Sequence, residues 1–186
     1  VRLTPSDRWI LSELDKLKKD CVKGYEDFNF FVPSNSIREF VWNILAPHYV
    51  EMVKARAYNS DHFFSKSEQQ AAWYALHRCL GSVLVLLAPI CPFMTDHLWR
   101  SIYSRRSIHT ESFPRPSGRA IKKLDELTKS IMEFNSTVWR YKKDRNLPLN
   151  QQLARAYASP RIKPLNKDLR AMHRITDLRY GIPNNV

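Results

Sequence analysis

Glycine and cysteine are scarce in this chain of 186 residues, and each shortage argues against a class of protein. There are only four glycines, and none of the Gly-rich patterns that cradle nucleotide phosphates occurs. The three cysteines, Cys21, Cys79 and Cys91, form no close pair. Their spacing argues against a disulfide framework or a zinc knuckle and fits a reducing compartment. We therefore expect neither a phosphate-binding loop nor a metal site.

Long apolar runs are also missing. The longest, Val83 to Ala88, is far too short to cross a bilayer. The N-terminal stretch "VRLTPSDRW" has no signal-peptide pattern. With 44% hydrophobic and 26% charged residues, the composition is that of an ordinary globular domain. We expect a soluble, cytoplasmic monomer with no membrane partner.

Acidic residues are outnumbered, and unevenly so. The formal net charge is +12, and residues 117–186 hold 15 Lys and Arg against 6 Asp and Glu. A one-sided positive field attracts polyanions, of which nucleic acid is the commonest. An anionic membrane would instead require an amphipathic helix with exposed apolar residues opposite its lysines. The charge pattern favours nucleic acid.

Apolar residues, by contrast, are abundant and recur at steps of three and four, which is typical of amphipathic helices. The steps from Ile10 to Phe28 predict a first helix of about 20–25 residues, capped by Thr4 or Ser6. A second helix is expected after a cap at Ser34 or Ser36, with a kink at Pro47.

Three further helices follow in the pattern. We expect them over about 67–87, over "PFMTDHLWRSIY", and over about 119–145. The short helix should turn Phe93, Leu98, Trp99 and Ile102 inward. Long helices joined by short links form a bundle, so the predicted fold is mainly α: an antiparallel helix bundle over residues 1–150. Residues 151–186 are expected to form a small β-α-β appendage, from "LARAYAS", "KPLNKDLRAMHRIT" and "LRYG".

One short stretch, "CPFMTDH", has the residue types of an active site, with Cys91, Thr95, Asp96 and His97 close together. Proline on both sides of the cysteine indicates a rigid turn between helices. No second ligand stands at helical spacing, as a helical metal site would need. We interpret the stretch as a structural corner, and we identify no catalytic residue and no metal site in the chain.

Two other stretches combine features suited to RNA. "VWRYKKDRN" places four cations at the end of the predicted fifth helix, where they could complement the helix C-terminus, contact phosphates, or do both. "DFNFFVPSN" places three phenylalanines at a helix-to-helix turn. Phe28 ends the apolar stripe and should be buried. Phe30 and Phe31 either pack beneath the loop or leave one ring free for an unpaired base.

Several of these stretches resemble a known family. "DRWILSELDKL", "SIREFVWNILAPHYVEMVKARAY", "LLAPICPFMTDHLWRSIY" with "SIHTESFP", and "VWRYKKDRNLPLN" occur in the order and spacing of the anticodon-binding region of class I aminoacyl-tRNA synthetases. Within that class they are most similar to the archaeal-type valyl-tRNA synthetases. The resemblance covers about residues 1–150.

The resemblance implies a helix bundle that grips the anticodon stem-loop of valine tRNA. Enzymes of this family attach the amino acid with ATP and Mg²⁺, using a catalytic domain of the same polypeptide with H-I-G-H-like and K-M-S-K-S motifs. Neither motif is present here, so this chain is expected to be a C-terminal fragment, inactive alone and without a cofactor. The RNA-contact candidates that follow are Phe30 and Arg38 for bases, Arg140, Lys142, Lys143 and Arg145 for phosphates, and Lys54 and Arg56 as weaker candidates.

Two alternatives remain open at this point. The chain could be the equivalent domain of an isoleucyl-tRNA synthetase, which belongs to the same class. It could also be a non-catalytic helical scaffold for protein interactions, whose charge serves only solubility. Dependence of binding on salt separates RNA binding from the scaffold, because neutralising 6–10 phosphates weakens affinity by about 10³–10⁵ between 50 and 200 mM salt.

Overall fold

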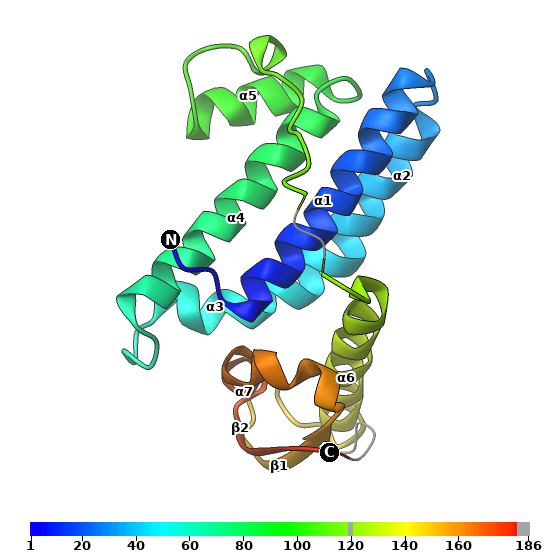
Figure 1. The fold of residues 1–186 in the computed structure, drawn as a ribbon. Helices are drawn as coiled ribbons and strands as arrows, with labels where there is room; N and C mark the ends of the chain where they lie inside the picture. The colour runs from blue at the N-terminus through cyan, green and yellow to red at the C-terminus, as the bar shows by residue number, and fades with distance from the viewer. Residues whose placement is uncertain (119–120, 182–186) are drawn as a thin grey trace.

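The computed structural model describes residues 1–118 and 121–181, and they form a mainly helical molecule (Figure 1). Three long helical segments run side by side, α5 lies across one end, and α6 with a small sheet occupies the other end. In chain order the elements are α1 Pro5–Glu26, α2 Phe31–Glu39, the π-helix η1 Phe40–Val50, α3 Glu51–Tyr58, α4 Lys66–Leu87, α5 Pro92–Ile102, the 3₁₀ turn η2 Ile108–Thr110, α6 Leu124–Asp144, β1 Leu153–Ala158, the 3₁₀ turn η3 Pro160–Leu165, α7 Asn166–His173 and β2 Ile175–Tyr180.

Helix α1 begins where its sequence predicts. The Thr4 hydroxyl accepts from the Asp7 backbone N–H, and the Asp7 carboxylate accepts from the Thr4 N–H at 3.0 Å, which completes a capping box. The apolar stripe from Ile10 onward is buried. The prediction that Phe28 is the last buried residue of this stripe is wrong, because Phe28 lies beyond the helix in a left-handed conformation and is 86% exposed.

The second predicted helix is longer than expected, because α2, η1 and α3 form one continuous helical segment. It begins at Phe31 rather than after Ser34 or Ser36, and the Ser34 hydroxyl donates instead to the Phe30 carbonyl oxygen at 2.7 Å. The predicted disturbance at Pro47 takes the form of a π-helix. The wider π-turn tolerates a residue that lacks a backbone N–H, so the chain continues through the proline.

Helices α4 and α5 lie where the sequence predicts them, but several side chains of α5 do not point inward as predicted. Ser65 and Glu68 form a second capping box at the start of α4. On α5, Phe93 is 90% exposed and Ile102 and Leu98 are also exposed, so their predicted inward orientation is wrong. The proline turn before α5 directs Thr95 and part of Trp99 inward instead.

The appendage is a β-α-β unit, as predicted. Strands β1 and β2 pair in parallel, with Leu153 opposite Ile175, and α7 connects them. A parallel pair needs such a crossover connection. The buried residues of α6, both strands and α7 belong to the same hydrophobic cluster as those of α1. Residues 119 and 120, where the predicted fifth helix starts, lie outside the described part of the chain, and within it α6 starts at Leu124.

Across residues 1–118 and 121–181, every helix is too short or too polar to cross a lipid bilayer.

Candidate nucleic-acid interface

The "CPFMTDH" corner uses its polar groups to hold its own fold. One Asp96 carboxylate oxygen accepts from the Ser107 hydroxyl at 2.7 Å and from the Ile108 N–H at 2.9 Å. The other accepts from Arg100 Nε at 2.7 Å. The hydrogen bonds from Ser107 and Ile108, with the Arg100 charge, lower the pKa of Asp96 to about 2. The carboxylate thus fastens the segment after α5 to the helix, and among the described residues no group of three His, Cys, Asp or Glu could hold a metal ion.

Arg56, a predicted RNA contact, is fully buried. Its guanidinium donates to both oxygens of Asp7, at 2.6 and 2.9 Å, and its Nε donates to Asp168 at 3.0 Å. These contacts tie α3 to the start of α1 and to α7. We therefore remove Arg56 from the RNA-contact set, because its charge is already neutralised inside the protein.

Lys142 is the second correction. The side chain is fully buried, and Nζ donates to the carbonyl oxygens of Leu149 at 2.6 Å and His173 at 3.1 Å. Burial lowers the pKa of Lys142, and the charge of Arg174 lowers it further. Lys142 therefore fixes the link from α6 to β1 and the end of α7, and it does not face a phosphate.

The other cations predicted at this helix end are exposed. Arg140, Lys143 and Arg145 have no carboxylate partner within the described residues. The Arg145 guanidinium lies over the ring of Tyr141, 3.9 Å from its centroid. This contact holds one face of the guanidinium while its N–H groups stay at the surface, as a phosphate contact requires.

The turn between α1 and α2 exposes more aromatic surface than expected. Phe30 packs edge-on against Tyr25 at 5.4 Å between centroids and remains half exposed. Phe31 is 76% exposed, so the interpretation that both rings pack beneath the loop is wrong. The free rings include Phe28, which the apolar spacing had assigned to the core.

The two remaining candidates are exposed but engaged with neighbours. The Arg38 guanidinium lies 3.5 Å from the Asn35 side-chain oxygen and 3.7 Å from Glu39. Lys54 forms an ion pair with Glu51, one turn earlier on α3. Pairs this exposed are weak, so either side chain can exchange its partner for a phosphate at small cost.

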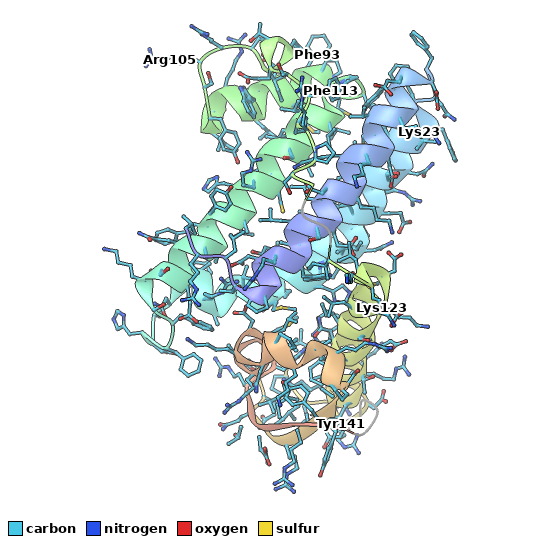
Figure 2. The ribbon with its side chains drawn as sticks, in the orientation of Figure 1. Lys23, Phe93, Arg105, Phe113, Lys123 and Tyr141 are labelled. Atoms are coloured by element: carbon cyan, nitrogen blue, oxygen red, sulfur yellow. The ribbon has the colours of Figure 1, made fainter. Side chains whose placement is uncertain are left out.

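The candidates fall into two sets at opposite ends of the molecule. The phenylalanine turn, residues 28–31, follows the C-terminal end of α1 near Lys23, whereas Tyr141, near the C-terminal end of α6, lies at the opposite end of the molecule (Figure 2). Helix α1 alone has 22 residues and spans about 33 Å. The aromatic set and the cationic set are therefore separate surfaces and cannot both contact one nucleotide.

Comparison with known proteins identifies the family. The family model described as "Anticodon-binding domain of tRNA ligase" matches residues 7–157. A valine–tRNA ligase of Pyrobaculum aerophilum is 38% identical over 97% of this chain and 22% of its own length, and that of Aeropyrum pernix is 33% identical over 98% and 23%. The valine–tRNA ligase of Thermococcus kodakarensis is 36% identical over 81% of this chain and 17% of its own length.

The chain thus spans about a fifth of the length of these relatives. The family match covers the helix bundle and the first strand of the appendage, which are the elements that carry both candidate surfaces. The chain belongs to the family of anticodon-binding domains of tRNA ligases.

Proposed function

We propose that this chain is the tRNA-binding part of a valine–tRNA ligase and binds the anticodon stem-loop of valine tRNA. The observation that carries the proposal is the family match over residues 7–157, together with valine–tRNA ligases as relatives over nearly the whole chain. The attachment of valine, with ATP and Mg²⁺, belongs to a catalytic domain of the same polypeptide. The protein works in translation in the cytoplasm and acts as a monomer.

The surfaces described above support RNA as the ligand. Proteins read RNA mainly at unpaired loops, where bases stack on aromatic rings and phosphates meet Arg and Lys. Phe30 and Phe31 offer rings at the α1–α2 turn, and Arg38 lies about two helical turns beyond them on α2. At the other end, Arg140, Lys143 and Arg145 offer cations that have no carboxylate partner among residues 1–118 and 121–181. Arg56 and Lys142 take no part.

The two alternatives are less well supported. An isoleucyl-type domain is disfavoured because the relatives given above are valine–tRNA ligases. A protein-interaction scaffold is disfavoured because the family model that matches residues 7–157 describes an anticodon-binding domain of tRNA ligases.

Binding to defined transcripts tests the proposal. Valine anticodons share A35 and C36, so filter binding to a valine tRNA transcript should weaken when either base is changed. Changing C36 to U gives an isoleucine anticodon, and changing position 34 serves as the matched control because valine anticodons vary there. Preference for U36 would overturn the valine assignment, and affinity that is indifferent to 35 and 36 would overturn anticodon binding.

A further inference from the structure

A groove lies away from the turn between α1 and α2, where α3 and the loop after it are close to α7 and β2 (Figure 1). Its volume is 870 Å³, within the range of roughly 300–1,000 Å³ that small-molecule sites occupy. We call it the α3–α7 groove. The side chains that the argument uses are those of Lys54, Tyr58, Phe63, Arg170, Arg174 and Thr176.

The groove is cationic. Its ionisable lining consists of Lys54, Arg170 and Arg174 against a single carboxylate, Asp61. Arg174 is exposed and has no ion pair among the described residues. Arg170 is held in place, because its guanidinium donates to the carbonyl oxygens of Ile175 at 3.2 Å and Thr176 at 2.7 Å. Arg174 therefore has no carboxylate partner among the described residues, and Arg170 is held in place. Lys54 pairs with Glu51, but that pair is exposed and can exchange for a phosphate at small cost.

The groove also has exposed aromatic rings at its edge. Tyr58, the last residue of α3, is 78% exposed, and Phe63 is 60% exposed. The Lys167 ammonium lies 5.2 Å from the Phe63 ring centroid, whereas Tyr58 has no ring or cation contact among the described residues. Large rings exposed next to unpaired cations are the composition of surfaces that bind single-stranded nucleic acid.

The loop that follows Tyr58 and carries Phe63 is closed by the side chain of Asn59. Asn59 adopts a left-handed conformation at the end of α3, and its side chain donates to the Phe64 carbonyl oxygen at 2.8 Å and accepts from the Phe64 N–H at 2.9 Å. Asparagine is one of the few residues that tolerate this conformation. Because Asn59 fixes the loop before any ligand arrives, binding need not include the cost of ordering it.

We propose that the α3–α7 groove binds unpaired RNA nucleotides, with a base stacked on the ring of Tyr58 and a phosphate held by Arg174 and Lys54. The exposed Thr176 hydroxyl, which accepts from Gln152, can still donate a hydrogen bond to a base edge or ribose. This inference deepens the proposed function and rests on it, since it adds a second RNA contact to the phenylalanine turn.

Fluorescence anisotropy with two labelled RNA probes tests the groove. One probe is a ten-nucleotide oligouridine, which has no structure, and the other is a fully paired RNA duplex. Tyr58→Ala should weaken oligouridine binding roughly 5- to 150-fold, the value of one stacked base, and leave duplex binding unchanged. Tyr58→Phe keeps the ring and should retain the affinity.

Charge reversal gives a second, independent readout. Arg174→Glu should weaken oligouridine binding and reduce its dependence on salt, whereas Lys19→Glu makes the same charge change on the exposed side of α1 and should have a smaller effect. Circular dichroism of each variant verifies that it is folded. Oligouridine binding that is absent, or equal in Tyr58→Ala, Arg174→Glu and the parent, would overturn the groove assignment.

The outcome is separable from that of the proposed function. If tRNA binding ignores bases 35 and 36 but oligouridine binding depends on Tyr58 and Arg174, the groove assignment holds and the valine anticodon proposal fails. If tRNA binding follows the valine anticodon but Tyr58→Ala and Arg174→Glu leave oligouridine binding unchanged, the groove assignment alone fails.

Discussion

Arg56 and Asp7 form a fully buried, two-pronged ion pair, with Nη2 to Oδ1 at 2.6 Å and Nη1 to Oδ2 at 2.9 Å. Burial by itself would raise the pKa of Asp7, but hydrogen bonds from Arg56 and Tyr49 outweigh it and hold that pKa below its usual value. Arg56→Met leaves this carboxylate buried without its partner. We expect it to lower the free energy of unfolding by about 3–5 kcal/mol in urea titrations.

The matched control for this prediction is Lys54→Met, on the same helix. The ion pair of Lys54 with Glu51 is exposed, and such pairs contribute about 1 kcal/mol or less. Equal losses in the two variants would contradict a structural role specific to Arg56.

Asn135 connects two buried histidines from different elements. Its Nδ2 donates to His48 Nδ1 at 3.0 Å, and its Oδ1 accepts from His173 Nε2 at 2.8 Å. Burial lowers the pKa of His48 to about 4 and that of His173 to about 3, the latter with help from the Lys142 charge. Both rings are therefore neutral in the folded protein at pH values where they are charged in the unfolded chain.

The free energy of unfolding should consequently decrease as the pH is lowered. Each histidine has a pKa near 6.5 in the unfolded chain, so below that pH the unfolded chain binds protons that the folded protein does not. The full contribution to the free energy of unfolding is therefore present above pH 6.5 and decreases as the pH falls toward the folded pKa values. Each histidine contributes a slope of about 1.4 kcal/mol per pH unit below about pH 5.5. Urea titrations of His48→Gln with His173→Gln should give a flatter profile, while exposed His62→Gln should keep the parental slope.

Lys142 and Lys143 are adjacent in sequence, but substitution of Lys142 should affect stability and substitution of Lys143 should affect RNA binding. Lys142→Met removes donors to two carbonyl oxygens and should reduce stability by about 1–3 kcal/mol. Lys143→Ala should leave stability within about 0.5 kcal/mol but reduce the slope of log affinity for tRNA against log salt by about one. A salt slope reduced by Lys142→Met in a folded protein would restore Lys142 as an RNA contact.

Asp96→Ala should loosen the segment from Ser104 to Phe113 without unfolding the helices. The substitution removes the acceptor for Ser107 and Ile108 and the partner of Arg100. Limited proteolysis should then cut this segment faster, and hydrogen exchange at Ile108 should accelerate. Ser101→Ala, on the exposed side of the same helix, should change neither rate.

Elements whose signal is local were predictable from the sequence. The Thr4 cap, the apolar stripe of α1 from Ile10 to Cys21 and the β-α-β order of the appendage have local sequence signals, and these were confirmed. The burial of Arg56 was not predictable, because its partner Asp168 lies 112 residues away and comes close only after α7 packs on α3. Helical spacing could have separated the two lysines, because Lys142 follows buried Val138 by four residues and Lys143 does not, but the charge of a lysine argued for the surface in both cases.

The predictions for the aromatic residues were wrong or incomplete for a different reason. Periodicity states which side chains share a face but not whether the core extends to the end of that face. The stripe of α1 therefore assigned Phe28 to the core, although the chain leaves the helix just before it. Tyr58 had no signal of its own, since a lone tyrosine at the end of a helix becomes informative only beside Arg174 from the appendage.

The uninterrupted helical segment from Phe31 to Tyr58 sets the distance between the aromatic residues at its two ends. At about 1.5 Å per residue, it holds the ring at its first residue and the ring at its last residue roughly 40 Å apart. Under the two proposals, a short hairpin would reach one ring at a time, and an RNA long enough to span the interval would gain avidity from contacting both. Because the helical segment continues through Pro47, the two proposals together predict that RNA size, and not only base sequence, affects binding.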